Sequence, residues 1–381
     1  MELNGNGGER LPVVIRGMTG RDLPGLLRPQ QGDGRLDLPD SVVSGYTPLS
    51  GLLRGRWNPF RGTRIRTYVA VVKQFPVAFM QVRDRPTDPR NKWDLIYLGA
   101  GRSAAAATPE RRVELWAALL DYITAAAGRR GVQRLYAKVA GADDVAEAFH
   151  VAGYTRYGEE TIHLLVGAPP DNLDNVEASE EFYIRSQVVG DTWALHQLYT
   201  LTAPKVVQYA EAYTSHRWEL PRRSAVAAQG GLREWGFVVE RGHEIAIYCR
   251  VARQGSKSRL EFVYEPTARE LLPQALSAIL HWLDPGQGEQ IYCATREFQA
   301  ELSSILREHG FAAKEVQDVL VRYTVVSARA PALAPVGRLT RERRLVGVPA
   351  GSLRRQGHDL AGASHGDVIA DQTEVGKLAE I

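Results

Sequence analysis

The sequence has only two cysteines in 381 residues, Cys249 and Cys293, and both lie in apolar, strand-like runs of the second half. Two thiols exclude a fold held together by a framework of disulfide bonds. Cysteines inside apolar strands are most simply buried and inert side chains. This low cysteine content fits a reducing compartment, and we expect a cytoplasmic protein.

Long apolar runs and a strong net charge are missing as well. No run reaches the roughly 20 residues that a membrane-spanning helix needs, and the first residues lack the apolar core of a signal peptide. The formal net charge of +3 gives no electrostatic case for binding nucleic acid. Most aromatic residues lie in strand-like runs, where core packing explains them better than base stacking. We expect neither a membrane nor a nucleic acid as partner, and the sequence leaves the oligomeric state open.

Motifs of several enzyme classes are also absent. The nine histidines form no HxxxH or HExxH pattern, and the spacing of histidine and cysteine supports no metal site. The sequence contains no P-loop, and its GxSxG string, GASHG at 362–366, lies in the Gly-rich end of the chain and not between a strand-like run and a helix-like run. Hydrolase and NTPase activities therefore lack a motif that would support them.

One pattern of residues occurs twice in the sequence. An apolar run, VQRLYAKV, leads into an amphipathic stretch, the pair Gly153-Tyr154 and a second apolar run that ends at Val166. The run QIYCATRE leads in the same way to Gly310-Phe311 and a last apolar run that ends at Val326. A glycine just past a helix supplies the left-handed cap, and the aromatic residue after it packs on the last turn. Two such copies indicate a duplicated domain.

The elements predicted before each copy also follow one order. Each half opens with a strand and a helical stretch, continues with three antiparallel strands and then has a helix that lies on the sheet. In the first half Thr108 is suited to cap that helix and Gly128 to end it. The predicted strands of the two meanders are 67–73, 76–82 and 93–98 in the first half, and 235–240, 244–251 and 259–265 in the second.

Composition and length set the domain boundaries. At 381 residues and 44% hydrophobic content, the chain can bury a core in each of two domains. Segments rich in Gly, Pro or charge indicate tails and a linker. We predict an unstructured N-terminus at 1–10, a first domain at 11–166, a linker at 167–181, a second domain at 182–329 and a disordered tail at 330–381.

This order of elements resembles the GNAT (N-acetyltransferase) superfamily. The resemblance rests on VVIRGMTGRDLPGLL at the start of the first half, on residues 93–128, and on AEAFHVAGY with its counterpart LSSILREHGF. It covers residues 11–166 and 182–326, although no signature motif is intact. It implies an α+β fold of two tandem GNAT-like domains, each with a mixed, mostly antiparallel twisted sheet flanked by helices on both faces.

The resemblance also implies acetyl-CoA as co-substrate, bound where the fourth strand of a domain meets the following helix. In the family the pyrophosphate binds the loop pattern Arg/Gln-x-x-Gly-x-Gly/Ala, because a helix N-terminus offers unpaired N–H donors and a partial positive charge. Here Val113 and Glu114 stand where the first half should have glycines, and Pro273 removes an N–H donor in the second. Gly99-Ala100-Gly101 is either a substitute cradle or a flexible exit from a strand. The candidate cofactor-binding residues are Leu98, Gly99, Arg111 and Arg112 in the first half, and Val263 and Arg269 in the second.

The general acid of the family is often a tyrosine four residues before the glycine that ends the later helix. Phe149 and Leu306 occupy these positions and cannot transfer protons. Losing a positioned acid typically lowers the rate by about 10²–10⁴. Tyr154 is our candidate substitute, with Tyr157 and Tyr136 near it in sequence, and each of the three also fits an ordinary packing role.

The base that deprotonates an amine is often a carboxylate on the central strands of the family. Glu261 is our candidate, with Asp94 and Glu240 as alternatives. Glu261 alternates with Leu260 and Phe262, so its side chain faces either water or a pocket. In a pocket we expect its pKa to rise, which would suit a general base.

Two functions follow from these features. The first is a GNAT-type acyltransferase that transfers an acetyl group from acetyl-CoA to an amine of a small molecule or peptide. The second is a catalytically inactive GNAT-fold pair that binds a ligand or a protein partner. Separated fourth and fifth strands with an open pocket would favour the enzyme, and strands closed by large side chains in both halves would favour the binding module.

Overall fold

The computed structural model describes residues 2–4, 10–26, 36–44, 65–85, 91–100, 108–140, 144–169, 183–221 and 231–324. The described residues belong to one compact unit. The predicted tail at 330–381 and most of the predicted linker, from residue 170 on, lie outside them. Within these ranges no helix combines the length and the apolar character needed to span a membrane.

In the first half, the meander β3–β5 is followed by helix α4, strand β6, helix α5 and the long strand β7. Thr108 caps α4 by accepting a hydrogen bond from the backbone N–H of Arg111, as its position predicts. Lys73 and Gln74 both have positive φ, as a two-residue type I′ hairpin turn requires. The elements are β1 (Glu2–Asn4), β2 (Arg10–Gly17), η1 (Gly20–Asp22), α1 (Leu23–Leu26), α2 (Leu38–Val43), β3 (Ile65–Val72), β4 (Phe75–Asp84), β5 (Lys92–Ala100), α4 (Pro109–Gly128), β6 (Arg134–Ala140), α5 (Asp144–Val151) and β7 (Thr155–Val166).

The second half repeats this order. Its three-strand meander and the helix after it match the predicted pattern, and the helix has buried apolar residues along one side. The elements are β8 (Tyr183–Ser186), η4 (Val189–Asp191), α6 (Thr192–Thr202), α7 (Lys205–Glu211), η5 (Ser215–Trp218), β9 (Arg233–Arg241), β10 (Glu244–Gln254), β11 (Lys257–Tyr264), η7 (Pro266–Leu271), α9 (Leu272–Leu283), β12 (Gln290–Arg296), η8 (Glu297–Gln299), α10 (Ala300–Glu308) and β13 (Ala312–Tyr323).

The duplication is visible in matching turns. Arg16 at the end of β2 binds Asp22 in η1 through two hydrogen bonds of 2.7 Å, and Arg185 binds Asp191 in the same way at 2.8 and 2.9 Å. Both pairs are six residues apart. Each aspartate also accepts from a backbone N–H three residues earlier, so the pair fixes the turn from strand to helix. The repeat IR-x5-D behind these turns is present in both halves of the sequence.

The C-terminal ends of α5 and α10, the helices that precede the last strand of each half, also match. Gly153 and Gly310 have φ of 73° and 84°, which confirms the predicted left-handed caps. The N–H of Tyr154 then bonds to the carbonyl of Phe149, and the N–H of Phe311 bonds to that of Leu306.

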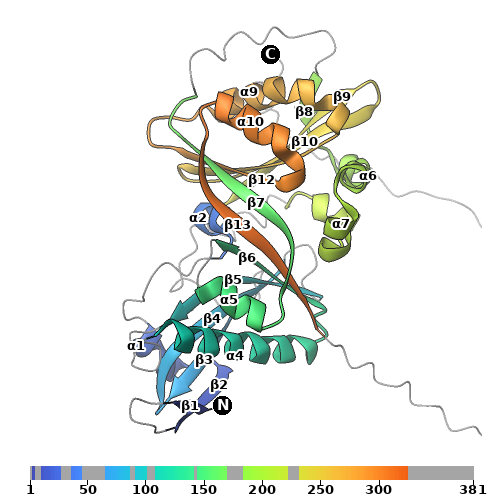
Figure 1. Ribbon diagram of the computed structural model, residues 1–381. Coiled ribbons are helices and arrows are strands. Elements are labelled where there is room, and N and C mark those ends of the chain that lie inside the picture. Colours follow the sequence, from blue (N-terminus) through green and yellow to red (C-terminus); the bar gives the residue numbers. More distant parts are fainter. Residues whose placement is uncertain are drawn as a thin grey trace, which may run out of the picture. The chain divides into compact units, whose positions relative to one another are not determined.

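The final strands of the two halves are exchanged between the sheets. The described strands form a 13-stranded sheet in the order β1-β2-β3-β4-β5-β6-β13-β7-β12-β11-β10-β9-β8. From the sequence we expected β7 to complete the sheet of the first half. Instead, β13 pairs with β6, β7 pairs with β12, and β7 and β13 pair with each other (Figure 1). Each half thus supplies a strand to the other.

The cores lie on opposite faces of this sheet. In the first half, α4 and α5 cover one face, where Leu119, Leu120 and Ile123 are fully buried. A second core lies under α6, α7 and η5 and includes Tyr136 of β6 and Tyr157 of β7. Helices of the second half therefore bury side chains of strands from the first, because the strand exchange brings those strands to them.

Candidate functional site

In each half two neighbouring parallel strands pair for a short distance and then separate. Strands β5 and β6 pair from Lys92 with Arg134 to Asp94 with Tyr136, although β5 continues to Ala100 and β6 to Ala140. Strands that separate present backbone N–H and C=O groups that the ladder between them no longer uses. We call this separation the first gap.

The chain itself bridges the first gap. The backbone N–H of Leu36 donates to the carbonyl of Ile96 on β5, and the N–H of Asp37 donates to the carbonyl of Lys138 on β6, both at 3.1 Å. Leu36 is 3% exposed, and its side chain packs in the same hydrophobic cluster as Leu98 of β5 and Val139 of β6. One peptide segment is thus hydrogen-bonded to both separated strands.

The residues that follow hold this segment in place. We call residues 36–44 the α2 segment. Asp40 accepts from Arg83 of β4 at 2.7 Å and from Arg259 of β11 at 2.9 Å, so one carboxylate joins strands of both halves. Burial alone would raise the pKa of Asp40, but the two guanidinium groups outweigh it and lower that pKa. Val43 packs with Ile162 and Tyr292.

The second gap lies between β11 and β12. These strands pair in parallel from Lys257 with Gln290 to Leu260 with Cys293, and both continue beyond that point. Here one side-chain amide makes the bridge. The Nε2 group of Gln299 donates to the carbonyl of Phe262 on β11 at 3.0 Å, and its Oε1 accepts from the N–H of Arg296 at the end of β12 at 3.1 Å.

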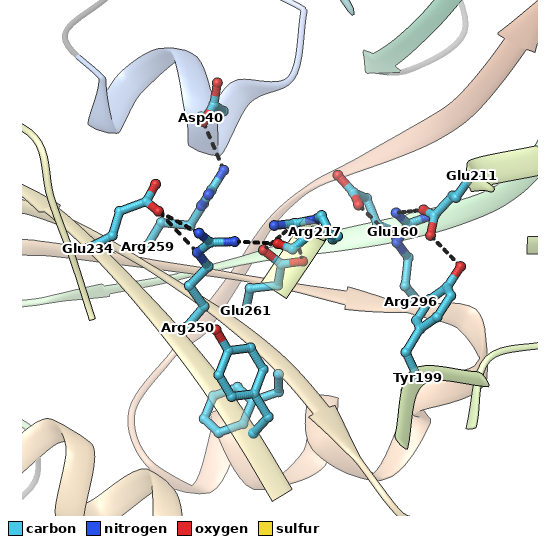
Figure 2. A network of polar contacts seen from close by, with 12 residues as sticks. Asp40, Glu160, Tyr199, Glu211, Arg217, Glu234, Arg250, Arg259, Glu261 and Arg296 are labelled. Carbon is cyan, nitrogen blue, oxygen red and sulfur yellow. Dashed lines mark hydrogen bonds and ion pairs between the residues drawn. The ribbon is translucent and has the colours of Figure 1, made fainter. Parts of the chain in front are cut away.

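Charged residues gather beside these gaps, on the side of α2, α7 and η5 (Figure 2). Glu261 of β11 accepts two hydrogen bonds from Arg217 of η5, at 2.6 and 2.8 Å. Arg217 also lies over the rings of Tyr213 and Trp218, which fixes its guanidinium group. We call these charged residues and their hydrogen-bonded tyrosine the junction cluster. The members labelled in Figure 2 are Asp40, Glu160, Tyr199, Glu211, Arg217, Glu234, Arg250, Arg259, Glu261 and Arg296.

The other end of the junction cluster is centred on Glu211 at the end of α7. Its carboxylate, which is almost fully buried, accepts from Tyr199 at 2.8 Å and from Arg296 at 2.9 Å. Arg296 reaches Glu160 of β7 as well, with 3.3 Å between Nε and Oε2. Burial and the neighbouring Glu211 raise the pKa of Tyr199, so this phenol stays protonated. Buried charges here are paired, as their desolvation demands.

The structure corrects our expectation for the pKa of Glu261. Burial does favour the neutral acid, but Arg217, Arg259 and Arg250 outweigh it and lower the pKa to about 2. Glu261 is therefore an ionised partner of arginines and only a weak base. The sequence missed this because Arg217 lies 44 residues away and on another element.

Comparisons by sequence return no relative: no family model matches the chain, and neither does any curated protein. Solved structures do match. A tandem GNAT protein from the clavulanic acid biosynthesis pathway is 14% identical, with a TM-score of 0.48, over 82% of this chain and 98% of that one. A GCN5-related N-acetyltransferase from Sphaerobacter thermophilus is 12% identical, with a TM-score of 0.47, over 82% of this chain and 95% of that one.

Within the chain itself, the strand–helix opening, the meander, the parallel fourth and fifth strands and the Gly-aromatic helix end occur in both halves in the predicted order. The chain thus has the order of elements that its resemblance to tandem GNAT-like domains predicts. The predicted fold class is confirmed, an α+β fold with a mixed sheet and helices on both faces. The domain boundaries stay predictions, although residues 2–4, inside the predicted unstructured N-terminus, form β1.

The cofactor candidates of the first GNAT half lie around the start of α4 and the end of β5. Leu98 and Gly99 are buried on β5 opposite Met80 and Phe79. Arg112 binds Asp144 of α5, with a distance of 2.9 Å from Nε to Oδ2, and Arg111 lies beside it in the first turn of α4. Gly101 and the loop up to residue 107 lie outside the described residues, as does any cradle they form.

The candidates of the second GNAT half lie past its gap. Val263 is half-buried on β11, two residues after Glu261, and Arg269 is exposed in η7 just before α9. Val263 and Glu261 alternate with the buried Phe262, so the two share the face of the sheet that carries the junction cluster. Val263 therefore lies on the same face as Glu261, and Arg269 follows six positions later in the chain, in η7.

Tyr154 lies away from the other candidates. It is 5% exposed, packs edge-to-face on Phe149 with ring centroids 4.9 Å apart, and is 5.9 Å from the guanidinium of Arg322. Burial raises its pKa. Arg322 binds Asp121, which is ten positions after Arg111 on α4 and so about 15 Å farther along the helix. The structure brings Tyr154 together with the end of α4, not with Arg111 and Arg112.

Several residues of this region give no signal in the sequence. His163 of β7 is 1% exposed and contacts Thr295 and Ser303 at 3.2 and 3.1 Å. Leu36, Asp37, Gln299 and Glu211 carry no motif. For these, partners distant in sequence are the only signal, and single-sequence patterns do not contain it.

Proposed function

We propose that this tandem GNAT-fold protein is an acyltransferase, which transfers an acetyl group from acetyl-CoA to an amine of a small molecule or peptide. Direct attack of the amine on the thioester, within a complex of all three partners, is the reaction that this fold class implies. The two buried, free cysteines support a cytoplasmic location.

One observation carries the proposal: in both halves the fourth and fifth strands separate after a short parallel ladder. A separated pair offers backbone donors and acceptors along an internal edge of the sheet. The pantetheine arm of coenzyme A is an extended chain with two amides, which suits such an edge as an added strand does. The binding energy would come mainly from the main chain, so glycine-poor loops do not exclude it.

The junction cluster supports an acceptor site on the face opposite α9 and α10. Its carboxylates Glu261 and Glu211 each pair with an arginine, so an acceptor amine would have to share a carboxylate with that arginine. With a pKa of about 2, Glu261 fits orientation of the acceptor better than proton abstraction. The amine would then lose its proton to water before it attacks the thioester. This order of steps suits an acceptor amine that is partly uncharged at the working pH.

Isothermal titration with acetyl-CoA and with free CoA tests the proposal. We expect micromolar dissociation constants. A panel of primary amines, followed by thiol release from acetyl-CoA, then identifies the acceptor class. Binding without thiol release for any amine would favour a ligand-binding module, and no binding at millimolar acetyl-CoA would contradict the acyltransferase.

A further inference from the structure

We infer that the chain fills both gaps with its own amide groups. The amides in the first gap stay in place, whereas the side-chain amide of Gln299 in the second gap is displaced by a ligand amide. One acyl-CoA therefore binds per chain, in the second gap at Gln299. The inference rests on the proposed function and adds to it which half holds the cofactor and which side chain the cofactor displaces.

The first gap has a permanent occupant. Two backbone N–H groups of the α2 segment, from Leu36 and Asp37, already bond to Ile96 and Lys138 on the two sides of the gap. To leave, this segment must also expose Leu36 and break both ion pairs of Asp40, one to each half of the protein. Removing one partner from such buried charges is strongly unfavourable. A pantetheine arm cannot compete with an occupant that the fold holds at so many points.

The second gap has an occupant that can leave. Among the described residues, Gln299 is the one that bridges the carbonyl of Phe262 and the N–H of Arg296, and it does so through one side-chain amide. A rotation about side-chain bonds withdraws that amide and uncovers one acceptor and one donor. An amide of a pantetheine arm offers the same two groups, an N–H and a C=O, and restores both hydrogen bonds. Gln299 therefore occupies the place of a ligand amide.

The geometry around Gln299 makes this exchange local. Gln299 ends η8, directly before α10, and its backbone stays where it is when the side chain turns. Glu261 and Val263 flank Phe262 on β11 and point to the opposite face, towards the junction cluster. A thioester in the second gap would thus meet an amine that arrives from the side of Glu261 and Arg217.

The variant Gln299→Ala tests the exchange by titration with CoA. We expect its dissociation constant to fall by about 3- to 10-fold, the range that one net hydrogen bond is worth, because the ligand no longer displaces the amide. Gln208→Ala is the matched control, since Gln208 also caps carbonyl groups through its side-chain amide, but on α7. Arg112→Ala in the first half should leave the affinity unchanged. Thermal denaturation of each variant confirms that it is folded.

Hydrogen–deuterium exchange of the wild-type protein tests the same inference without a variant. CoA should slow exchange in residues 261–264 and 294–299, and leave residues 36–44 and 95–100 unchanged. Protection in the first half, a stoichiometry of two, or an unchanged affinity of Gln299→Ala would overturn the inference and leave the acyltransferase standing. No binding by the wild-type protein would overturn both.

Discussion

At the scale of single residues, the pairing of Glu261 with Arg217 decides the chemistry that this carboxylate can perform. A strand carboxylate next to a gap looks like a general base until its neighbours are known. Three arginines near it, Arg217, Arg250 and Arg259, keep it ionised down to a pH of about 2.

The first prediction concerns Glu261→Gln. The pKa of Glu261 is lowered from 4.5 to about 2 in the folded protein, so the carboxylate stabilises the fold above pH 4.5 and loses this contribution as the pH falls towards 2. The variant should lower the free energy of unfolding by about 1–3 kcal/mol at pH 7, the range of charge-assisted hydrogen bonds. Urea denaturation at several pH values measures it, and the difference from wild type should shrink below pH 4.5.

Glu265→Gln is the control for this prediction. Glu265 lies just past the same strand and pairs with Arg241 in an exposed position, so its change should stay within about 0.5 kcal/mol. If Glu261→Gln leaves stability intact and lowers kcat by about 10²–10⁴, Glu261 is a base after all.

At the scale of elements, the strand-to-helix turn of each half is the clearest trace of the duplication. Asp22 and Asp191 both bind an arginine six residues earlier and a backbone N–H three residues earlier. The arginine side chain and its hydrogen bonds lower the pKa of Asp22 to about 2. The same device thus starts the first helices of both halves.

The second prediction concerns Asp22→Asn and Asp191→Asn. Each variant removes a bidentate ion pair, and we expect each to lower the free energy of unfolding by about 1–3 kcal/mol. The two variants should lower the free energy of unfolding by similar amounts, because the two ion pairs have similar geometry. Asp121→Asn, which changes an exposed partner of Arg322, should have an effect below about 1 kcal/mol. Urea denaturation at pH 7 compares the three, and equal effects at all three sites would contradict the prediction.

At the scale of the whole molecule, the exchanged strands β7 and β13 join the two halves in one sheet. Strand β13 pairs with β6 of the first half, and β7 pairs with β12 of the second. Asp40 adds ion pairs to Arg83 and Arg259, one in each half. Neither half can complete its part of the sheet without the other, so their unfolding should be coupled.

The third prediction is that damage to one core destabilises both halves. Leu119→Ala leaves a cavity under α4 and should lower the free energy of unfolding by about 2–5 kcal/mol. Hydrogen exchange at increasing urea should show β3 and β10 unfolding at one shared, lowered midpoint. Ile279→Ala in α9 is the reciprocal variant and should shift both strands equally. Two separate midpoints would mean that the halves are independent domains.

The sequence by itself determined what depends on neighbours along the chain. The cap of α4 by Thr108, the left-handed Gly153 and Gly310, the apolar face of α4 and the repeated order of elements all follow from local spacing. Local backbone preferences and hydrophobic periodicity act over a few residues, so a single sequence contains them. They were enough to predict the α+β fold class and the repeated order of elements.

Only the tertiary structure decided which groups meet across the sheet. Strand exchange has no local signal, because β7 and β13 would have the same sequence pattern if each paired only with strands of its own half. Leu36 and Asp37 reach the first gap from a segment without periodicity, and Arg217 reaches Glu261 from a separate helix. A charge or an unused backbone group takes whichever partner the fold brings near, and that choice sets the pKa of Glu261 and the occupants of both gaps.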